Sequence, residues 1–552
     1  MRRVLCAAAL LTAATAVPAA TAQTGGTLGT GGAPVRLLPL GARNGVSVLD
    51  GGTGTLYAGP RLVAIAPGGA VSFPGGGDAF DPATSVAPRV FSLDARGALV
   101  WAGLGFNDAA VGAESPPETA AGFAVSTDGG ATFAYRFPAT DEFADTLVTY
   151  GRSTLRAVPS TVPQFAAPLD LAIARGDTVY AALRTGGLRR TTNGGRTWRR
   201  IVLPPDSLVT LDPRRTYDFV YDPSESLFAD SGLNFAPFSV LYDAGGTLWV
   251  GTGSGLNRSF RVPGAADPGW VRYLDSPFRN ADGTAVGPVG NLVYALERRP
   301  GVAGGRETVW AACWPSGLPG QTESEEFGVV VWRGDDAEGF ARFEPVLLGV
   351  QVFDLAFDAP GGGGRAYAAA GAAGLYISAT DGASWWAVTA FNAPDGRPLP
   401  LRPGTVVLAV ATAATGLYVG TSDGLLRSTD GGLTWELLRA SPEPGADTSG
   451  DGTRIDSPEV EVYAYPNPFT PSRDGALRVR FTLDATAAAT VRIFDTAMNP
   501  VRTLDAPGRG AGANEVSWDG LSDDGLRVAN GPYVYVVQAG GRQLSGRILV
   551  LN

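Results

Sequence analysis

Residues 417–435 read LYVGTSDGLLRSTDGGLTW, and this stretch contains the two patterns that decide the fold of the chain. The apolar segment LYVG is followed by a polar turn with Asp and Gly, a second apolar segment, and a glycine-rich turn that ends in tryptophan. Short apolar runs separated by Gly and Asp turns are typical of β-hairpins. The stretch therefore predicts neighbouring strands of an antiparallel sheet, and both of its patterns recur along the chain.

The first pattern is an aromatic residue in a short apolar strand, followed by small residues, and it occurs seven times. Successive copies are between 44 residues (57 to 101) and 79 residues (101 to 180) apart. None is closer than the roughly 40–45 residues of a four-stranded propeller blade. We therefore predict a seven-bladed β-propeller over residues 23–440, with the additional residues in loop insertions. The seven aromatic residues are Tyr57, Trp101, Tyr180, Trp249, Trp310, Tyr367 and Tyr418.

The second pattern is the glycine-rich turn, which is complete at residues 126–133, 191–198 and 428–435. Residues 378–385 form a degraded copy, with Thr380 where the others have Asp or Asn. An Asp or Asn side chain accepts hydrogen bonds from its own turn, glycine permits positive φ, and the aromatic residue packs onto the sheet. We therefore predict structural turns formed by Ser126, Asp128, Gly130, Thr132, Phe133, Thr191, Asn193, Gly195, Thr197, Trp198, Ser378, Gly382, Trp385, Ser428, Asp430, Gly432, Thr434 and Trp435.

These turns resemble the Asp-box, S-x-D-x-G-x-T-W, of sialidase-type (BNR) propellers. The resemblance implies that each turn joins the third and fourth strands of a blade and lies at its periphery. It therefore implies no direct catalytic role for Asp128, Asn193 or Asp430. The predicted fold class is all-β: a seven-bladed β-propeller followed by a small immunoglobulin-like antiparallel sandwich.

The composition excludes several classes of chemistry. The 552 residues include no histidine, and all 43 basic residues are arginine. Ser-His-Asp and Cys-His nucleophiles, histidine metal ligands and lysine Schiff bases are therefore impossible. The formal net charge of −10 argues against nucleic acid as a partner, because binding to a phosphate backbone needs a basic surface. We predict no catalytic residue, no cofactor and no metal site.

The N-terminus predicts export. Two arginines precede an apolar run, and Ala-Thr-Ala at residues 20–22 provides small residues for cleavage, which is the pattern of a secretory signal peptide at residues 1–22. Removal of this segment leaves Cys313 as the remaining thiol, and its apolar surroundings predict a buried structural residue. No later stretch has the apolar length of about 18 residues that indicates a transmembrane helix.

The last part of the chain has a different character. Residues 441–459 are rich in Pro, Gly, Asp and Ser and predict a linker. Residues 460–552 predict an antiparallel β-sandwich. This module resembles the FlgD-like immunoglobulin fold and the type A C-terminal sorting domain of type IX secretion substrates, through YPNPF at 465–469 and WDG at 518–520. The resemblance implies the type IX secretion machinery as a partner and a secreted or outer-surface location, or a periplasmic one if the module is only a stalk.

The first functional hypothesis is a monomeric, non-catalytic scaffold that binds a protein or glycan. Function on rigid folds resides in their loops, and long insertions are expected at 136–168, 203–237 and 259–290. Their aromatic residues could stack on a sugar or contact a protein, or each insertion could pack onto its own blade. These residues are Tyr217, Phe219, Tyr221, Phe228, Phe235, Trp270 and Tyr273.

The second hypothesis is a sialidase-like glycoside hydrolase, which would use two carboxylates, or a tyrosine and a carboxylate. The segment YRFP at residues 135–138 resembles the arginine motif of sialidases, although it follows an Asp-box here instead of preceding the first one. Such an enzyme would place two carboxylates roughly 5–10 Å apart near the axis, with an arginine beside them. The candidates are Asp141, Glu142, Asp145, Asp218, Tyr221, Asp222 and Glu225.

Overall fold

The computed structural model describes most of the chain. The described residues are 35–38, 48–51, 55–59, 63–66, 71–72, 89–107, 118–163, 166–227, 231–275, 286–301, 306–315, 326–337, 339–358, 364–399, 401, 404–440, 462–483, 485–509 and 512–551. The predicted signal peptide, the predicted linker and Phe228 lie outside them. The described residues divide into two compact units, the first with residues 48–389 and 406–421 and the second with residues 35–38, 390–405 and 422–551.

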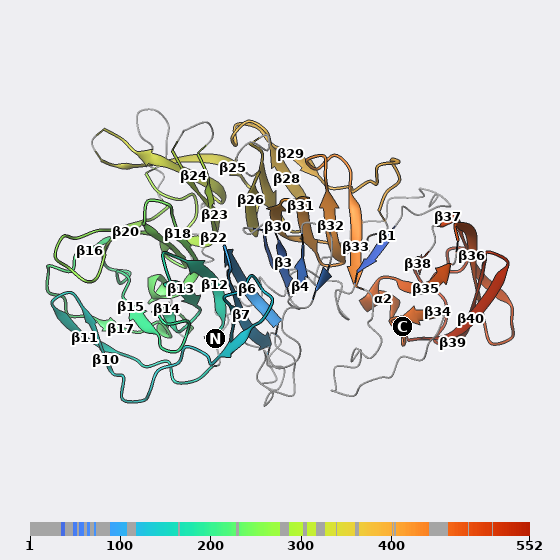
Figure 1. Ribbon diagram of the computed structural model, residues 1–552, viewed down its shortest axis with the longest axis horizontal. Helices are drawn as coiled ribbons and strands as arrows, with labels where there is room; N and C mark the ends of the chain where they lie inside the picture. Colours follow the sequence, from blue (N-terminus) through green and yellow to red (C-terminus); the bar gives the residue numbers. More distant parts are fainter. Residues whose placement is uncertain are drawn as a thin grey trace. The chain divides into compact units, whose positions relative to one another are not determined.

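Seven small sheets follow one another along the chain (Figure 1), and in each the strands pair antiparallel in chain order. The first two are β2 (Val48–Asp50), β3 (Leu56–Gly59), β4 (Val63–Ile65), β5 (Val71–Ser72), and β6 (Arg89–Arg96), β7 (Leu99–Asn107), β8 (Glu118–Ser126), β9 (Ala134–Arg136). The third and fourth are β12 (Pro168–Ile173), β13 (Val179–Leu183), β14 (Gly187–Thr191), β15 (Arg199–Ile201), and β18 (Pro237–Tyr242), β19 (Leu248–Thr252), β20 (Gly255–Phe260), β21 (Gly269–Tyr273).

The fifth and sixth sheets are β22 (Leu292–Arg299), β23 (Thr308–Trp314), β24 (Gly328–Asp335), β25 (Ala341–Leu348), and β26 (Asp354–Phe357), β27 (Ala366–Ala369), β28 (Leu375–Ser378), β29 (Trp386–Val388). The seventh consists of β30 (Val407–Ala413), β31 (Gly416–Thr421), β32 (Gly424–Ser428) and β33 (Glu436–Ala440). Two sheets gain a fifth, outer strand. In the fourth sheet β16 (Thr210–Leu211) pairs with β21, and in the seventh β1 (Val35–Leu38) pairs in parallel with β33.

The first strands of the seven sheets form a closed ring. Each of β2, β6, β12, β18, β22 and β26 contacts the first strand of the following sheet, and β30 contacts β2. A ring of sheets that closes through its innermost strands is a β-propeller. The predicted seven-bladed propeller is therefore confirmed, and each sheet is one blade.

The repeated aromatic residue occupies the second strand of every blade. Six of the seven side chains are buried, and Tyr180 is half-buried. Burying a side chain of this size stabilises the fold by about 1.5–3 kcal/mol. Because every blade repeats this contribution, the pattern that was visible in the sequence also marks the core of each blade.

Two of the insertions fold into a small additional sheet, beside blades three and four. It consists of β10 (Leu147–Tyr150), β11 (Ser153–Ala157) and β17 (Val220–Tyr221), with β10 antiparallel and β17 parallel to β11. Two 3₁₀ turns, η4 (Glu225–Leu227) and η5 (Leu233–Phe235), follow β17. Tyr150, Leu155 and Tyr221 belong to a core that includes Leu188 and Val250 of blades three and four. The insertions are therefore folded parts of the propeller.

The second unit contains an immunoglobulin-like sandwich of two sheets. One sheet has the order β34 (Val462–Tyr465), β35 (Leu477–Leu483), β38 (Gly512–Trp518), and the other β37 (Pro500–Arg509), β36 (Ala487–Phe494), β39 (Gly531–Ala539), β40 (Arg542–Val550). A single helical turn, α2 (Pro471–Asp474), precedes β35. The core between the sheets includes Phe469, Ile493 and Trp518. The last two strands, β39 and β40, are joined by a two-residue turn of Gly540 and Gly541, both with positive φ.

A buried ion network lies within the second unit. Arg478 of β35 is paired with Asp423, in the turn before β32, at 2.5 Å and with Glu515 at 3.4 Å. The hydroxyl of Tyr465 donates a hydrogen bond to Glu515. All three charged side chains are buried. Because one guanidinium serves two carboxylates, its removal would leave two buried negative charges without their cation.

Candidate functional site

The glycine-rich turns are stapled by their own side chains. In the first one, the Ser126 hydroxyl donates to Asp128 at 2.7 Å and accepts from the Gly130 N–H at 2.8 Å. The Asp128 carboxylate also accepts from the Thr132 N–H at 2.9 Å and from its hydroxyl at 2.5 Å. These bonds, first of all that of the Thr132 hydroxyl, lower the pKa of Asp128 to about 2. A carboxyl group in this state is ionised and does not serve as an acid near neutral pH.

The same bonds recur in the other turns. Asn193 and Asp430 each accept from the backbone N–H four residues later, at 3.1 and 2.9 Å. In the degraded copy, the Thr380 hydroxyl accepts from the Ser384 N–H at 2.8 Å, so a threonine substitutes for the missing carboxylate. The hydroxyl is shorter and uncharged, but the four-residue turn still closes.

The two sequence patterns meet between neighbouring blades. A Cβ atom added to Gly130 would lie 2.9 Å from the Tyr57 ring, and one added to Gly195 would lie 3.0 Å from the Trp101 ring. Both glycines have positive φ. The repeated aromatic residue of one blade therefore packs beneath the glycine-rich turn of the next, which leaves no room for a side chain there. Gly382 has the same relation to Trp310.

Of the hydrolase candidates, Asp141 is held by two buried arginines. Arg189 contacts its two oxygens at 2.5 and 2.9 Å, and Arg200 contacts one of them at 2.8 Å. Burial alone would raise the pKa of Asp141, but the hydrogen bonds and charge of Arg189, followed by those of Arg200, lower it. The carboxylate therefore anchors the insertion to β14 and β15 and stays ionised.

The remaining hydrolase candidates are placed in local contacts. The Arg136 guanidinium donates to the carbonyls of Gly194 and Tyr135, so the YRFP segment bridges to the next blade's turn. Asp145, Asp222 and Glu225 accept hydrogen bonds from nearby residues of their own loops. Tyr221 is buried, and this burial raises its pKa to about 12. The structure does not bring these groups to the ring of first strands. Glu142 and Asp218 are exposed.

The first strands bear a different set of carboxylates, which the sequence patterns did not single out. They are Asp50, Asp94, Asp170, Glu297 and Asp354, and all five are half-buried. Asp50, Asp94 and Glu297 pair across the sheet with the repeated aromatic residue of their blade. Asp170 and Asp354 lie opposite the small residue two positions further on. The carboxylates therefore occupy two levels of the innermost strands.

These carboxylates join successive blades. Asp170 accepts a hydrogen bond from the Val240 N–H of blade four at 2.8 Å, and Asp354 accepts from the Val410 N–H of blade seven at 2.9 Å. Asp50 accepts from the Ala95 N–H at 2.9 Å, and Asp94 accepts from the N–H of Ile173. Each bond satisfies a backbone group that would otherwise face the ring unpaired. These four carboxylates are therefore clamps between neighbouring first strands. The Glu297 carboxylate instead accepts from the adjacent Arg298 N–H.

Burial dominates the electrostatics of this ring. It raises the pKa of Asp94 to about 8, with the nearby Asp50 carboxylate as the next cause. It also raises the pKa of Asp170 and Asp354 to about 7 and that of Glu297 well above its ordinary value. The Arg298 cation opposes the shift at Asp94 and Glu297. Asp94, Asp170 and Asp354 therefore exchange protons near neutral pH.

No metal centre was found in the part of the chain that the structure describes. Its His, Cys, Asp and Glu residues include no group of three or more that could hold a metal ion. Cys313 is buried in β23, and its thiol donates to the Ala311 carbonyl at 3.6 Å. Among the same described residues, no helix has the length and hydropathy needed to cross a bilayer.

The aromatic residues of the insertions are mostly in the core. Tyr221, Phe235 and Trp270 are buried, and Tyr217 and Phe219 pack against the same cluster. Tyr273 contacts Phe343 edge to face. The packing alternative is therefore the one observed for these rings. The apolar side chains exposed on the first two insertions are different ones: Phe137, Phe143, Leu147, Val158, Val162, Val209 and Val220.

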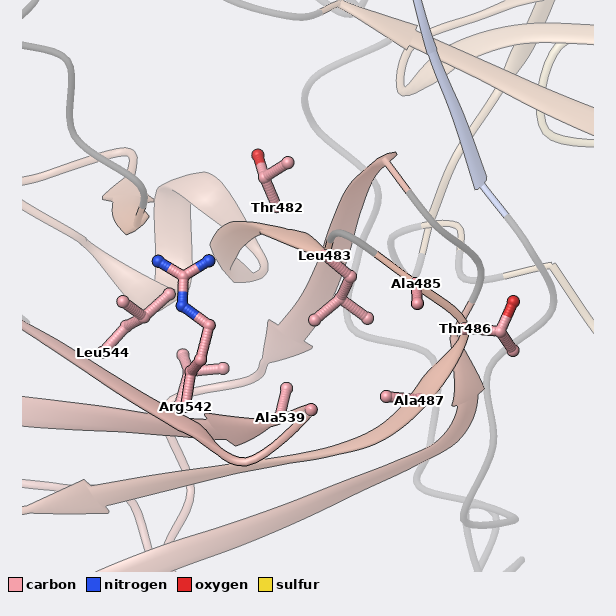
Figure 2. A pocket seen from close by; sticks show the side chains of 10 residues that line it. Thr482, Leu483, Ala485, Thr486, Ala487, Ala539, Arg542 and Leu544 are labelled. Atoms are coloured by element: carbon pink, nitrogen blue, oxygen red, sulfur yellow. The ribbon is translucent and has the colours of Figure 1, made fainter.

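The sandwich has a small cavity of about 160 Å³ at the end of its two sheets, shown in Figure 2. Leu483, Ala487 and Ala539 line it from β35, β36 and β39, and Leu544 and Arg542 line it from β40. Its lining is mainly apolar and it is smaller than the roughly 300–1,000 Å³ of ordinary ligand pockets. We therefore regard it as a packing gap at the end of the sandwich.

Comparison with known proteins identifies the C-terminal module. Residues 469–543 match the family model of the FlgD Ig-like domain. The match covers most of the sandwich and none of the propeller. The search of curated proteins gave no match to the chain.

Several solved structures resemble the chain. PorZ, a surface component of the type-IX secretion system of Porphyromonas gingivalis, has 16% identity and a TM-score of 0.31, over 90% of this chain and 64% of that one. YCF48 from Cyanidioschyzon merolae has 15% identity and a TM-score of 0.35, over 70% and 95%. The GH74 enzyme of Niastella koreensis has 13% identity and a TM-score of 0.43, over 95% and 74%. This chain thus spans less than two thirds of PorZ, and at these identities the likeness concerns the fold.

Proposed function

We propose that this chain is an exported, non-catalytic propeller that binds a partner through the insertions between blades two and four. One observation carries the proposal: large apolar side chains stay exposed on these insertions, among them Phe143, which is 82% exposed, and Leu147, which is 60% exposed. Contiguous exposed apolar surface is typical of interaction sites. The insertions are held on a rigid scaffold, which is the usual arrangement for a binding surface.

The glycine-rich turns are structural in this proposal. Their side chains are engaged in their own turn, and their glycines pack on the preceding blade. They stabilise the contact between blades and do not act on a substrate. The C-terminal sandwich, residues 460–552, serves export through the type IX machinery, after removal of a signal peptide at residues 1–22. Its resemblance to sorting domains and its match to the FlgD Ig-like domain support this part.

A glycoside hydrolase is the second candidate, and the inner ring is the observation that favours it. Asp94 has a raised pKa and interacts with Asp50, and the Arg298 cation is close enough to oppose the shift. A proton donor with a pKa near neutrality beside a second carboxyl group is the arrangement that a glycosidase needs. Against it, Asp50 and Asp94 are already engaged as clamps between blades.

A panel of fluorogenic glycosides, including a sialoside, tests both candidates on the full chain. We expect no turnover above buffer. Turnover that is lost in Asp94→Asn but retained in Asp128→Asn would favour the hydrolase, because only the first variant changes the inner ring. Glycan arrays and cell-surface binding assays then measure the scaffold function directly.

The export function has a separate test. Residues 460–552 fused to a monomeric fluorescent protein with a signal peptide should reach the cell surface in the organism of origin. The same fusion with Trp518→Ala, which empties the sandwich core, should stay in the periplasm. Equal surface display of the fusions with and without Trp518→Ala would contradict a sorting role.

A further inference from the structure

The outer strand of the insertion sheet, β10, has an open edge. The Ala157 N–H donates to the Thr146 carbonyl at 2.7 Å, and this pair continues the register of β10 and β11. Because hydrogen-bonded and non-bonded pairs alternate in an antiparallel ladder, the N–H and C=O groups of Leu147 and Thr149 point away from β11. Among the described residues, no backbone partner accounts for them. Figure 1 shows β10 at the periphery of the first unit.

This edge lacks the features that normally protect an outer strand. Proteins block their sheet edges with charged residues, proline, bulges or a covering segment. The outer strands β9 and β15 of the propeller contain arginine, and β25 contains proline and bulges. β21 and β33 are covered by β16 and β1. In contrast, β10 reads LVTY, without charge, proline or bulge, and is composed of residues with high strand propensity.

The outward face of the same sheet carries apolar side chains, the two threonines Thr149 and Thr154, and one cation. Leu147 of β10, Arg156 of β11 and Val220 of β17 lie side by side across the three strands. Leu147 is 60% exposed and Val220 is 40% exposed. Val158, 41% exposed, continues this face at the end of β11. Arg156 is exposed, and within the described residues it has no ion-pair or hydrogen-bond partner.

The charges near this face are arranged unevenly. The charged residues of the sheet face and of the β10–β11 turn are both cations, Arg156 and Arg152. The acidic neighbours lie outside the sheet: Glu142 and Asp145 in the preceding turn, and Asp218 before β17. The Asp145 carboxylate already accepts a hydrogen bond from the Glu142 N–H. A ligand that covers the face therefore meets apolar side chains, two threonines and an arginine that lacks a counter-ion.

We propose that β10 accepts an extended, acidic segment of another protein as an additional strand. The segment pairs its backbone with Leu147 and Thr149, places apolar side chains beside Leu147, and directs a carboxylate toward Arg156. Backbone pairing supplies affinity in such additions, and the alternate side chains supply specificity. The strand β10 lies between the added strand and Arg156 of β11, so the backbones of the added strand and β11 are about 10 Å apart. An arginine and a glutamate side chain can together bridge this distance. This inference deepens the proposed binding function and depends on it.

A focused peptide library tests this proposal on the full chain. Its members are capped seven-residue peptides with Thr at odd positions, Val or Ile at positions 2 and 6, and Glu, Gln or Lys at position 4, so that the apolar and the variable side chains share one face. Peptides retained by the immobilised protein are then measured by fluorescence anisotropy. We expect retained sequences to be rich in Glu, and their affinity to fall with added salt. Retention of Glu and Lys peptides alike, or of none, would overturn the proposal.

Three variants separate backbone pairing from charge. Thr149→Pro removes an N–H that faces the open edge and spares the β10–β11 ladder, so it should weaken binding at least tenfold in a protein with unchanged melting temperature. Arg156→Glu should weaken the Glu peptides at least tenfold and favour Lys peptides. Arg196→Glu, which makes the same charge change at an exposed arginine in a distant turn, should leave binding unchanged. Equal binding by wild type and Thr149→Pro would refute strand addition.

Two further outcomes are distinguishable. Self-association of the wild type that disappears in Thr149→Pro would assign the edge to a second copy and overturn the proposal. Binding of a cell-surface glycan that is equal in wild type and Thr149→Pro would also overturn it, while the broader scaffold function would stand.

Discussion

The substitution Asp170→Asn tests whether this inner carboxyl group holds a proton near neutral pH. Burial raises the pKa of Asp170 from 3.8 to about 7. Asparagine cannot titrate, yet its amide oxygen can still accept the bond from the Val240 N–H. The variant Asp170→Asn therefore removes the proton equilibrium and keeps the clamp between blades three and four.

The sign of the effect follows from the two pKa values. Between pH 3.8 and about pH 7 the folded protein keeps a proton at Asp170 that the unfolded chain has lost. The free energy of unfolding therefore falls as pH rises, by about 1.4 kcal/mol per pH unit for one group. The stabilisation is complete below the unfolded pKa and is lost as pH passes through the folded pKa. Over this window it amounts to at most about 4 kcal/mol.

Urea unfolding at pH 5, 6 and 7, followed by tryptophan fluorescence, measures this slope. In the wild type, stability should decrease from pH 5 to pH 7, and in Asp170→Asn the decrease should be smaller by about 1 kcal/mol per pH unit. Asp395→Asn is the control, because the Arg397 side chain lowers the pKa of this exposed carboxyl and it stays ionised throughout the range. Identical slopes in wild type and Asp170→Asn would refute the reasoning.

Three other substitutions probe the packing of the fold. Trp435→Ala removes a buried ring whose centroid lies 5.2 Å from that of Phe391, edge to face. It should lower the free energy of unfolding, measured by chemical denaturation, by about 3–5 kcal/mol. An unchanged melting temperature would contradict the role of this ring in anchoring its turn. Arg478→Ala should destabilise the protein by about 3–5 kcal/mol, because it strands two buried carboxylates, and the loss should shrink at acidic pH. Gly195→Ala should lower the free energy of unfolding by about 1–3 kcal/mol, and by more than Gly194→Ala does. Both glycines have positive φ, but only Gly195 faces the Trp101 ring. Equal losses of stability in the two variants would contradict this packing.

The glycine-rich turns could be predicted because their interactions are local. Asp128 and Asp430 bond within four residues of themselves, so the spacing of residue types already specifies the geometry. The contact of Gly195 with Trp101 could not be predicted, since it depends on which blades are neighbours. Both patterns were visible, but the sequence did not indicate that one packs on the other.

The candidate sites show a similar division. The insertion aromatics Tyr221 and Trp270 had two open interpretations in the sequence, and only the shared core decides that they are buried. Asp141 was a candidate catalytic acid in the sequence. The structure pairs it with Arg189 and Arg200, which are distant in sequence, and so gives it a structural role. A carboxylate's role depends on its partners, and these partners come from other strands.

The sequence by itself determined the all-β class, the number of blades and the sandwich at the C-terminus. These follow from short-range physics: strand propensity, turn chemistry, and the repetition of one buried aromatic residue per blade. Only the tertiary structure decided that Asp50, Asp94, Asp170 and Asp354 clamp neighbouring first strands together, and that β10 keeps an open edge. Ring closure brings together side chains from strands that are far apart in the chain, and whether an edge is covered depends on every other segment. Neither property can therefore be predicted from the neighbouring residues in the sequence.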